Sequence, residues 1–355
     1  MLRSHCLFFA LLAFTMNTPL LAQNDVYRLG LENRVTKLEK KRLTPYHPIT
    51  PSAGPRVKKG LDLFLMGDLL YWTARLDALS YAQTGPLSLP AQFPHRASDH
   101  SIDWDWDFGF RVGMGWSFCH GDWDMQLKYT WFYTQGSDST IDTVHPSFDF
   151  FLFNSITASG GASALWDMRY QLGTWEIGRN FFVQRYLKLR PFIGAQGTWQ
   201  KQETTLRYLN LTSNEGNFIS ARSRFNQRIW GLGPRLGMNS SWQFTRWAGL
   251  YGDFALSGLW LHYDTTRSNR LTVTDTQTFF LPLKKTLRLT KPTIELGLGL
   301  RLESYLSCRR LHLLFQVGWE THIWPNQTLY INLGESLQRF DLLLHGGTAR
   351  LRFDF

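Results

Sequence analysis

The stretch Trp104-Asp-Trp-Asp-Phe-Gly-Phe-Arg-Val-Gly-Met-Gly-Trp116 places an aromatic or aliphatic residue at every second position, with Asp, Gly or Arg between them. After a polar break at residues 119–121, the alternation resumes from Trp123 to Tyr133. Successive side chains of a β-strand point to opposite faces. The stretch therefore predicts a β-hairpin with one apolar face and one hydrophilic face.

The length of this hairpin indicates a membrane rather than water around its apolar face. Each arm runs for about a dozen residues, whereas a strand in a soluble sheet averages about five or six. Tilted strands that cross a bilayer need about 9–11 residues. The apolar face also carries Trp or Tyr near both ends, as residues at membrane interfaces do. We therefore predict a transmembrane β-hairpin.

The composition of the whole chain agrees with a membrane barrel. The 355 residues are 43% hydrophobic, yet the mean hydropathy is −0.25. Beyond the N-terminus there is no apolar run of about 18 residues, the length that a membrane-spanning helix requires. A barrel alternates lipid-facing with polar residues, so its average hydropathy stays low. The net charge of +10 is spread singly among acids, so we do not expect nucleic acid as a partner.

The N-terminal 59 residues divide into three predicted segments. Residues 1–22 form a signal peptide, with Arg3, an apolar run at 6–14 and a cleavage site after Ala22. Residues 23–44 form a short periplasmic amphipathic helix. Within it, Leu31 and Leu38 have coiled-coil spacing, so residues 24–43 could either join subunits into a homo-oligomer or form a solvated helix. Residues 45–59 form a proline-rich linker.

Residues 60–355 contain the predicted barrel. Ten alternating segments are expected at 61–73, 103–117, 122–134, 166–179, 186–200, 226–239, 246–261, 290–304, 311–323 and 341–355. Short and long connections alternate between them, as tight periplasmic turns and long outer loops do in bacterial barrels. The sequence thus predicts an all-β, transmembrane antiparallel β-barrel of about ten strands, with both termini periplasmic in the outer membrane of a Gram-negative-type bacterium.

Two irregularities leave the strand count open. Met168, Tyr170 and Leu172 have the opposite parity to Trp175 and Ile177, which predicts a β-bulge in the fourth segment. Further strands within 147–156 or 271–281 would widen the barrel, because its diameter grows with strand number.

Aromatic residues mark the expected membrane boundaries and the end of the chain. We predict that tryptophans near the segment ends form membrane girdles: Trp104, Trp106, Trp116, Trp123, Trp131, Trp199, Trp230, Trp260 and Trp319. The final strand ends in Phe353 and Phe355, which resembles the signal that the barrel assembly machinery recognises. The expected partners are this machinery, outer-membrane lipid and lipopolysaccharide.

The parity opposite to the apolar face supplies the charges that would line a lumen. These are Asp124, Lys128, Arg169, Lys188, Arg190, Arg235, Asp253, Glu295, Arg301, Glu303, Arg350 and Arg352. Rings of such charges can set the ion preference of a channel. In a narrow barrel, the same charges can instead pair across the lumen and close it. Both readings stay open at this stage.

Two further features bear on function. Asp103, Asp105 and Asp107 precede one strand, and His262 with Asp264 ends another, so a protease site at the rim is one alternative. Cys119 and Cys308 lie at predicted periplasmic turns, where they could cross-link two molecules, pair within one molecule or stay reduced. We expect no enzyme, no cofactor and no metal site.

Several motifs resemble the Legionella-type major outer membrane proteins and the related proteins of environmental chlamydiae. They are Asp68-Leu-Leu-Tyr-Trp72 with Asp77-Ala-Leu-Ser-Tyr81, Trp106 to Trp116, Gly233-Pro-Arg-Leu-Gly237 with Trp242, and the closing Arg350-Leu-Arg-Phe-Asp-Phe355. The resemblance implies an abundant pore-forming barrel without catalytic residues. We therefore predict a porin-like channel for ions or small solutes. The alternatives are a structural or adhesive surface barrel with a closed lumen and, least supported, an omptin-like protease.

Overall fold

The computed structural model describes most of the chain from residue 62 onward. The described residues are 62–76, 79–84, 98–118, 123–147, 157–184, 186–213, 216–245, 247–273, 277–306, 311–332 and 337–355. The predicted signal peptide, helix and linker lie outside them, as do Cys119 and Cys308. No helix among the described residues is long and apolar enough to cross a membrane.

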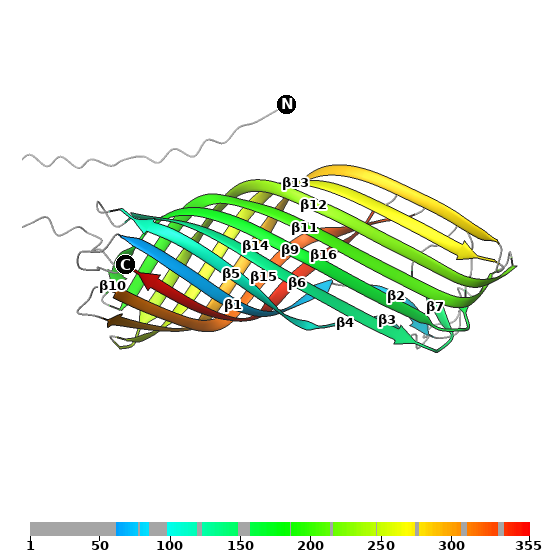
Figure 1. Cartoon of the computed structure of the whole chain (residues 1–355), viewed down its shortest axis with the longest axis horizontal. Coiled ribbons are helices and arrows are strands. Elements are labelled where there is room, and N and C mark those ends of the chain that lie inside the picture. The colour runs from blue at the N-terminus through cyan, green and yellow to red at the C-terminus, as the bar shows by residue number, and fades with distance from the viewer. Residues whose placement is uncertain are drawn as a thin grey trace, which may run out of the picture. The chain divides into compact units, whose positions relative to one another are not determined.

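Ten long strands form a closed antiparallel barrel, which confirms the predicted fold class (Figure 1). Their bounds are β1 (Leu63–Leu76), β5 (Trp106–Ser117), β6 (Trp123–Thr140), β9 (Ala162–Arg179), β11 (Leu187–Ser213), β12 (Gly216–Gln243), β13 (Ala248–Thr272), β14 (Thr278–Leu306), β15 (Leu311–Ile331) and β16 (Leu337–Asp354). Each predicted segment overlaps one of these strands. The barrel closes where β1 pairs with β16, as in Asp68 opposite Arg350.

Six short strands accompany the barrel. They are β2 (Ser80–Thr84), β3 (Ser98–Ser101), β4 (Asp103–Trp104), β7 (Val144–Pro146), β8 (Thr157–Ala158) and β10 (Phe181–Gln184). β3, β2, β7 and β8 pair in sequence and join the end of β11 through Ala158 opposite Leu211. The described part of 271–281 belongs to β13 and β14 and adds no strand to the ring.

The two halves of the barrel differ in how far their strands extend and in their composition. We call the end that carries Leu63 and Asp354 the terminal end, and the opposite end the far end. β11 to β14 contain 27, 28, 25 and 29 residues. A bilayer crossing needs only about 9–11 residues. These strands therefore continue at the far end well beyond the length that a membrane can cover.

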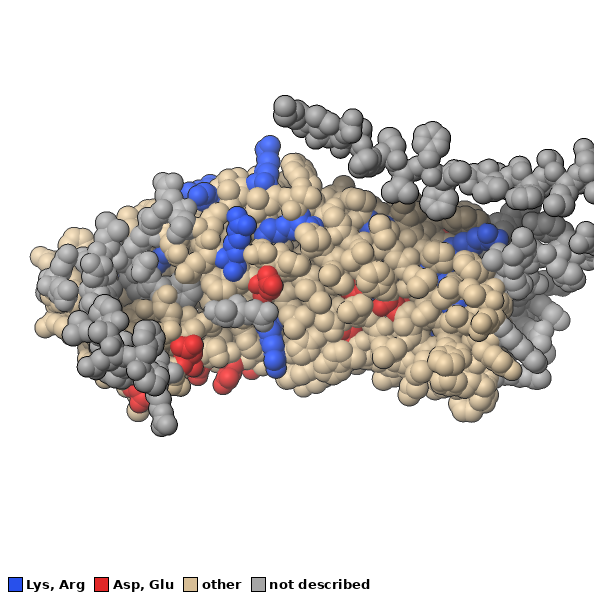
Figure 2. All heavy atoms as spheres, turned by 180° about the vertical axis from the view of Figure 1, so that it is seen from behind, with Lys and Arg blue, Asp and Glu red and all other residues tan. Residues whose placement is uncertain are grey.

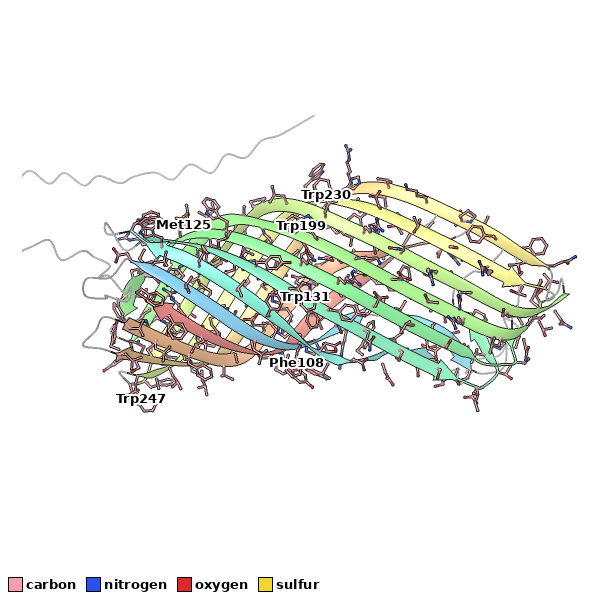
Figure 3. All side chains as sticks on the ribbon, in the orientation of Figure 1. Phe108, Met125, Trp131, Trp199, Trp230 and Trp247 are labelled. Carbon is pink, nitrogen blue, oxygen red and sulfur yellow. The ribbon has the colours of Figure 1, made fainter. Side chains whose placement is uncertain are left out.

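An apolar outer band surrounds the terminal half of the barrel. Exposed side chains in this band include Phe108, Ile193 and Leu298, which are 65%, 66% and 65% exposed. Trp131, Trp199 and Trp230 project outward on β6, β11 and β12 (Figure 3). On the face shown in Figure 2, the right-hand half of the surface carries few charged side chains, whereas charged side chains gather to its left. This band has the composition expected of a lipid-facing surface.

Trp104 departs from the predicted girdle. The parity of the first hairpin breaks at Asp105, which lies between β4 and β5. Trp104 packs against the buried Trp166 at 4.9 Å, whereas Trp106 stays on the outer face. The prediction for Trp104 was therefore wrong, because uniform alternation was assumed across this break.

The outer band leads to a first testable prediction. Replacing Leu298 by Arg should lower the free energy of unfolding by about 2–4 kcal/mol, because a charged side chain near the bilayer midplane loses its hydration. Urea unfolding of protein refolded into phospholipid vesicles would measure the change. Thr286→Arg, on the outer face of the same strand but beyond the band, is the matched control and should change stability little. Equal costs for the two variants would contradict the position of the band.

The far half of the barrel contains an apolar core instead of a wet lumen. Trp72, Phe132, Trp166, Tyr170 and Trp324 all face inward and are at most 1% exposed. Trp72 packs edge-on against Phe132 at 5.7 Å, and Tyr170 packs edge-on against Trp324 at 5.9 Å. Packed aromatic side chains therefore fill much of this half, beside buried polar groups such as Arg267, Asn269 and Gln227.

The apolar core also explains the parity change in the fourth predicted segment. β9 pairs with β6 and β11 without any register shift, so the predicted β-bulge is wrong. Met168, Tyr170 and Leu172 face inward and are buried, whereas Trp175 is exposed on the outer face. The strand keeps its parity. The apolar residues change faces because the far half is dry inside and the terminal half is apolar outside.

The end of β15 crosses the interior of the far half. The register of its pairing with β16 shifts between Trp324 and Thr328, and Asn326 has a φ of 53°. Beyond this point, residues 325–331, here called the inserted segment, contact the inner face of β11. Gln327 donates a hydrogen bond to Gln200 at 3.0 Å, and Thr328 donates one to Gln202 at 2.7 Å. The inserted segment thus spans the barrel interior at the far end.

Candidate functional site: the charged lumen

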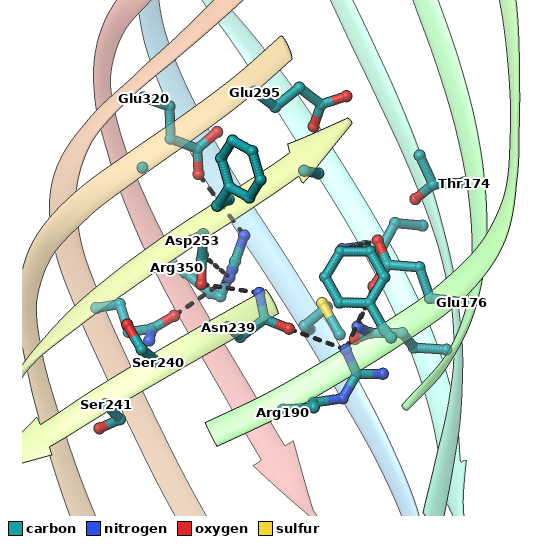
Figure 4. A pocket seen from close by; sticks show the side chains of 18 of the residues that line it. Thr174, Glu176, Arg190, Asn239, Ser240, Ser241, Asp253, Glu295, Glu320 and Arg350 are labelled. Carbon is teal, nitrogen blue, oxygen red and sulfur yellow. Dashed lines mark hydrogen bonds and ion pairs between the residues drawn. The ribbon is translucent and has the colours of Figure 1, made fainter. Parts of the chain in front are cut away.

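The terminal half of the lumen is lined by charged side chains around a cavity of 140 Å³. Inward positions of six strands supply Glu176, Arg190, Asp253, Glu295, Glu320 and Arg350 (Figure 4). Glycines alternate with these residues on several strands. At Gly237 an added Cβ would lie 2.5 Å from the Phe192 ring, so glycine leaves room for that side chain.

Glu176 is the centre of one ionic cluster. Its side chain is 0% exposed, and its carboxylate lies 2.9 Å from the Lys128 ammonium and 3.1 Å from the Arg235 guanidinium. Arg190 approaches it at 3.4 Å, and Gln126 donates a hydrogen bond to it at 2.5 Å. One buried anion is therefore shared by three cations from β6, β11 and β12.

Asp68 and Glu320 form a second cluster with two arginines. The Asp68 carboxylate lies 2.9 Å from Arg111 and 2.8 Å from Arg350. Arg111 also contacts Glu320 at 2.8 Å. Because Asp68 is fully buried, these contacts replace the hydration that its charge would otherwise require.

A third cluster lies nearer the terminal end. Glu303 contacts Arg301 at 2.5 Å and both Lys188 and His312 at 3.5 Å. His312 also contacts Asp354 at 2.7 Å. Through His312 and Asp354, the penultimate residue is tied to the inner wall of the barrel.

The three clusters restrict what the lumen can do in this conformation. A cavity of 140 Å³ holds water but is small for a continuous aqueous pore. Acidic and basic side chains pair in each cluster, with Asp124 on Arg190 and Glu295 on Arg235 adding to the first, and the apolar core with the inserted segment lies on the far side. In this conformation the lumen is therefore a charged internal chamber, and the described residues leave no wide pore through the barrel.

Comparison with known proteins gives the family. The profile of a family described as Legionella pneumophila major outer membrane protein precursor matches residues 54–355. The chain belongs to this family. The match covers the whole barrel and confirms the resemblance proposed from the motifs. The family and the fold together place the protein among outer membrane β-barrel proteins. No match is found among curated proteins.

Solved structures with a similar fold are also outer membrane proteins. The outer membrane protease OmpT of Escherichia coli is 10% identical with a TM-score of 0.39, covering 85% of this chain and 100% of that chain. A FadL homologue of Pseudomonas aeruginosa is 7% identical with a TM-score of 0.26, covering 82% and 89%. Ail of Yersinia pestis is 9% identical with a TM-score of 0.25, covering 82% and 97%.

The structure places the predicted lumen charges of this outer membrane protein as follows. Arg169 was predicted inward but lies on the outer face, because the odd-numbered residues of β9 share that face with Trp175. The other predicted residues occupy inward positions: Asp124, Lys128, Lys188, Arg190, Arg235, Asp253, Glu295, Arg301, Glu303, Arg350 and Arg352. Inward charges that the sequence-based set omitted include Asp68, Arg111, Glu176, Glu320, His312, His322 and Asp354 in the terminal half, and Arg267 and Lys291 in the far half.

The alternation of side chains along each strand could have identified some of these omitted charges. Arg111 stands on the hydrophilic parity of the Trp106 to Trp116 strand, and Glu176 alternates with Trp175 and Ile177. The assumed β-bulge in β9 obscured this, because it assigned Arg169 to the lumen and left the parity of Glu176 undefined.

The predicted rim residues do not form one site. His262 lies 3.5 Å from Asp264, and both side chains are on the outer face of β13. Asp103, Asp105 and Asp107 lie in or next to β4 and β5, separated from β13 by four strands in either direction around the ring. Within the described ranges, no three His, Cys, Asp or Glu side chains form a group that could hold a metal ion.

Outside the membrane-spanning part, the small sheet at the far end is joined to the barrel by tyrosines. The Tyr81 hydroxyl donates a hydrogen bond to Asp138 at 2.9 Å. Burial, reinforced by this hydrogen bond, raises the pKa of Tyr81. The hydroxyl of Tyr208 in turn donates to the Tyr81 carbonyl. Tyr81 therefore stays neutral and acts as a structural donor.

Proposed function

We propose that the protein is a narrow, porin-like channel for ions and small solutes and a component of the outer envelope. In this proposal the terminal end faces the periplasm and the far end faces outside. The chain carries out no catalytic step.

The observation that supports the proposal is the contrast between the two halves of the barrel interior. Replacing buried ion pairs by packed apolar residues is often neutral or stabilising. The far half packs aromatic side chains around Trp72 and Trp324 and, among the described residues, buries no carboxylate. The terminal half instead keeps a charged cavity around Glu176 and Arg350, at a cost in desolvation. A barrel selected for stability alone would not need that cavity, whereas passage of hydrated solutes does.

The inserted segment makes the channel gated in this proposal. Gln327 and Thr328 hold it against β11 by neutral hydrogen bonds, which contribute about 0.5–1.5 kcal/mol each. From β13, the Arg267 guanidinium donates a further hydrogen bond to the Ile331 carbonyl at 2.8 Å. Its displacement toward the outside would connect the cavity to the far end. The same contacts favour the second candidate, a closed surface barrel in which the segment never moves.

A variant in which the inserted segment can be fixed covalently to β11 tests the proposal. Gln200→Cys with Gln327→Cys, in a protein whose Cys119 and Cys308 have been changed to Ser, can be joined by a short bis-maleimide cross-linker. The two glutamines meet through their amide ends, so the linker spans the gap that the shorter cysteine side chains leave. We expect discrete conductance steps in planar bilayers before cross-linking. After cross-linking, we expect at least a tenfold fall in open time, because the segment can no longer leave the lumen.

The control joins two strands that the gate does not involve. Gln135→Cys with Asp167→Cys links neighbouring outward positions of β6 and β9. Cross-linking of this control should leave conductance unchanged. Steps that persist in the cross-linked gate variant would exclude gating by the inserted segment. No steps from any protein before cross-linking, with a β-rich circular dichroism spectrum, would favour the closed surface barrel.

A further inference from the structure

Basic side chains gather on the outer face of β9, β11, β12 and β13, beyond the tryptophan girdle. Trp199 stands opposite Trp230 in the girdle. Two residues farther along the strands, Lys201 stands opposite both Arg169 and Arg228. Directly opposed side chains lie about 4.5–5.5 Å apart at their Cβ atoms. Three cations on neighbouring strands thus form a row about two residues from the girdle.

A second row lies nearer the far end. Arg222 stands opposite both Arg207 and Arg270, so three arginines are adjacent on β11, β12 and β13. Like charges that face each other across strands destabilise a sheet. Burial, and then the charges of Arg207, Arg224 and Arg270, lower the pKa of Arg222. This row is therefore an electrostatic cost that a bound anion would remove.

The acidic residues on the same surface do not neutralise it. Glu203 pairs with Arg224 at 3.3 Å and with Lys201 at 3.6 Å. Asp167 stands opposite Glu203, and Asp264 stands opposite Arg228. Cations remain in excess in this surface, here called the basic stripe: Arg169, Lys201, Arg207, Arg222, Arg224, Arg228 and Arg270.

A hydroxyl-lined groove adjoins the stripe at its far end. It has a volume of 470 Å³ and is lined in part by Ser137, Ser139, Ser163, Thr205 and Arg207. The groove is also lined by Asp138, whose carboxylate accepts the hydrogen bond from Tyr81. Hydroxyl groups beside a guanidinium suit a sugar that carries anionic groups, because both donate hydrogen bonds.

We propose that the basic stripe and the adjoining groove bind the phosphorylated lipid and core sugars of one lipopolysaccharide molecule. The acyl chains would lie along the apolar band below Trp199 and Trp230, and the lipid phosphates would contact the row of Arg169, Lys201 and Arg228. The core sugars would extend along the strands toward Arg222 and the groove. This assignment rests on the proposed function only in taking the far end as the outer side.

Binding of fluorescent lipopolysaccharide to the refolded protein in neutral detergent micelles tests the proposal. Each cation near an anionic lipid surface contributes about 1 kcal/mol, a factor of about five. Lys201→Gln with Arg228→Gln should therefore weaken binding by roughly 30-fold. The matched control is Arg75→Gln with Arg339→Gln, which removes the same charge at the same end but on β1 and β16. The control should change affinity less than twofold.

Two competitors identify the group that is bound. Dephosphorylated lipopolysaccharide should bind much more weakly than the intact molecule, and inorganic phosphate at 10-fold excess should not displace the intact molecule. Equal losses in both double variants, no loss in either, or full displacement by free phosphate would each overturn the proposal. Binding in micelles needs no conductance and no fixed orientation, so a failed channel assay leaves this test unaffected.

Discussion

Glu176→Gln should lower the free energy of unfolding by about 3–5 kcal/mol, because removing one partner of a buried ion pair leaves uncompensated buried charge. The carboxylate is 0% exposed and is shared by Lys128, Arg190 and Arg235. Glutamine keeps the size of the side chain but leaves Lys128 without its carboxylate partner, whereas Arg190 and Arg235 keep Asp124 and Glu295. Urea unfolding in phospholipid vesicles, followed by tryptophan fluorescence, would measure the loss.

Glu203→Gln is the matched control for this prediction. Glu203 also contacts two cations, Lys201 and Arg224, but its side chain is 24% exposed and these partners are 36% and 52% exposed. Exposed ion pairs contribute about 0–1 kcal/mol. If both substitutions cost less than about 1 kcal/mol, water must enter the lumen freely and screen the Glu176 cluster, which would contradict a closed chamber.

The sequence predicted the barrel well where lipid lies outside and charge lies inside. The Trp106 to Trp116 stretch, the ten segments and most lumen charges follow from one rule, the alternation of side chains across a strand. The rule failed at Met168, Tyr170 and Leu172, because it assumed a wet interior along the whole strand. Once the interior is dry, an apolar residue at an inward position is the expected choice.

The predicted strands were also too short at the far end, because the alternating pattern stops there. The predicted segment 186–200 ends where Lys201, Gln202 and Glu203 interrupt the pattern, although β11 continues to Ser213. There the strand is held by its neighbours β9 and β12 and by inward contacts such as Thr204 with Tyr330 at 2.6 Å. Such contacts join residues 126 positions apart, and alternation within one strand carries no information about them.

The sequence could not predict which lumen charges pair with one another. Parity indicates which residues face inward but not which of them meet. Asp68 and Arg350 are 282 positions apart, and they become neighbours only because β1 closes the ring against β16. Ring closure depends on strand number, so an uncertain strand count left every pairing across the lumen undefined.

Trp72→Ala should cost about 3–5 kcal/mol of unfolding free energy, the range for removing a large buried aromatic side chain. Trp72 is 0% exposed, packs against Phe132 and lies 5.6 Å from the Arg111 guanidinium. Its indole N–H donates a hydrogen bond to Thr348 at 3.2 Å. The substitution would leave a cavity where the apolar core meets the Asp68 cluster.

The preceding residue provides the control, because it faces the opposite side of the same strand. Tyr71 is 44% exposed and stacks on Trp106 at 5.3 Å. Tyr71→Ala should cost about 1 kcal/mol, the contribution of a lost aromatic pair. A large loss for Trp72 with a small one for Tyr71 requires a packed interior at this level. Comparable small losses would mean that the far half is hydrated, and the inserted segment would then have no apolar core to close against.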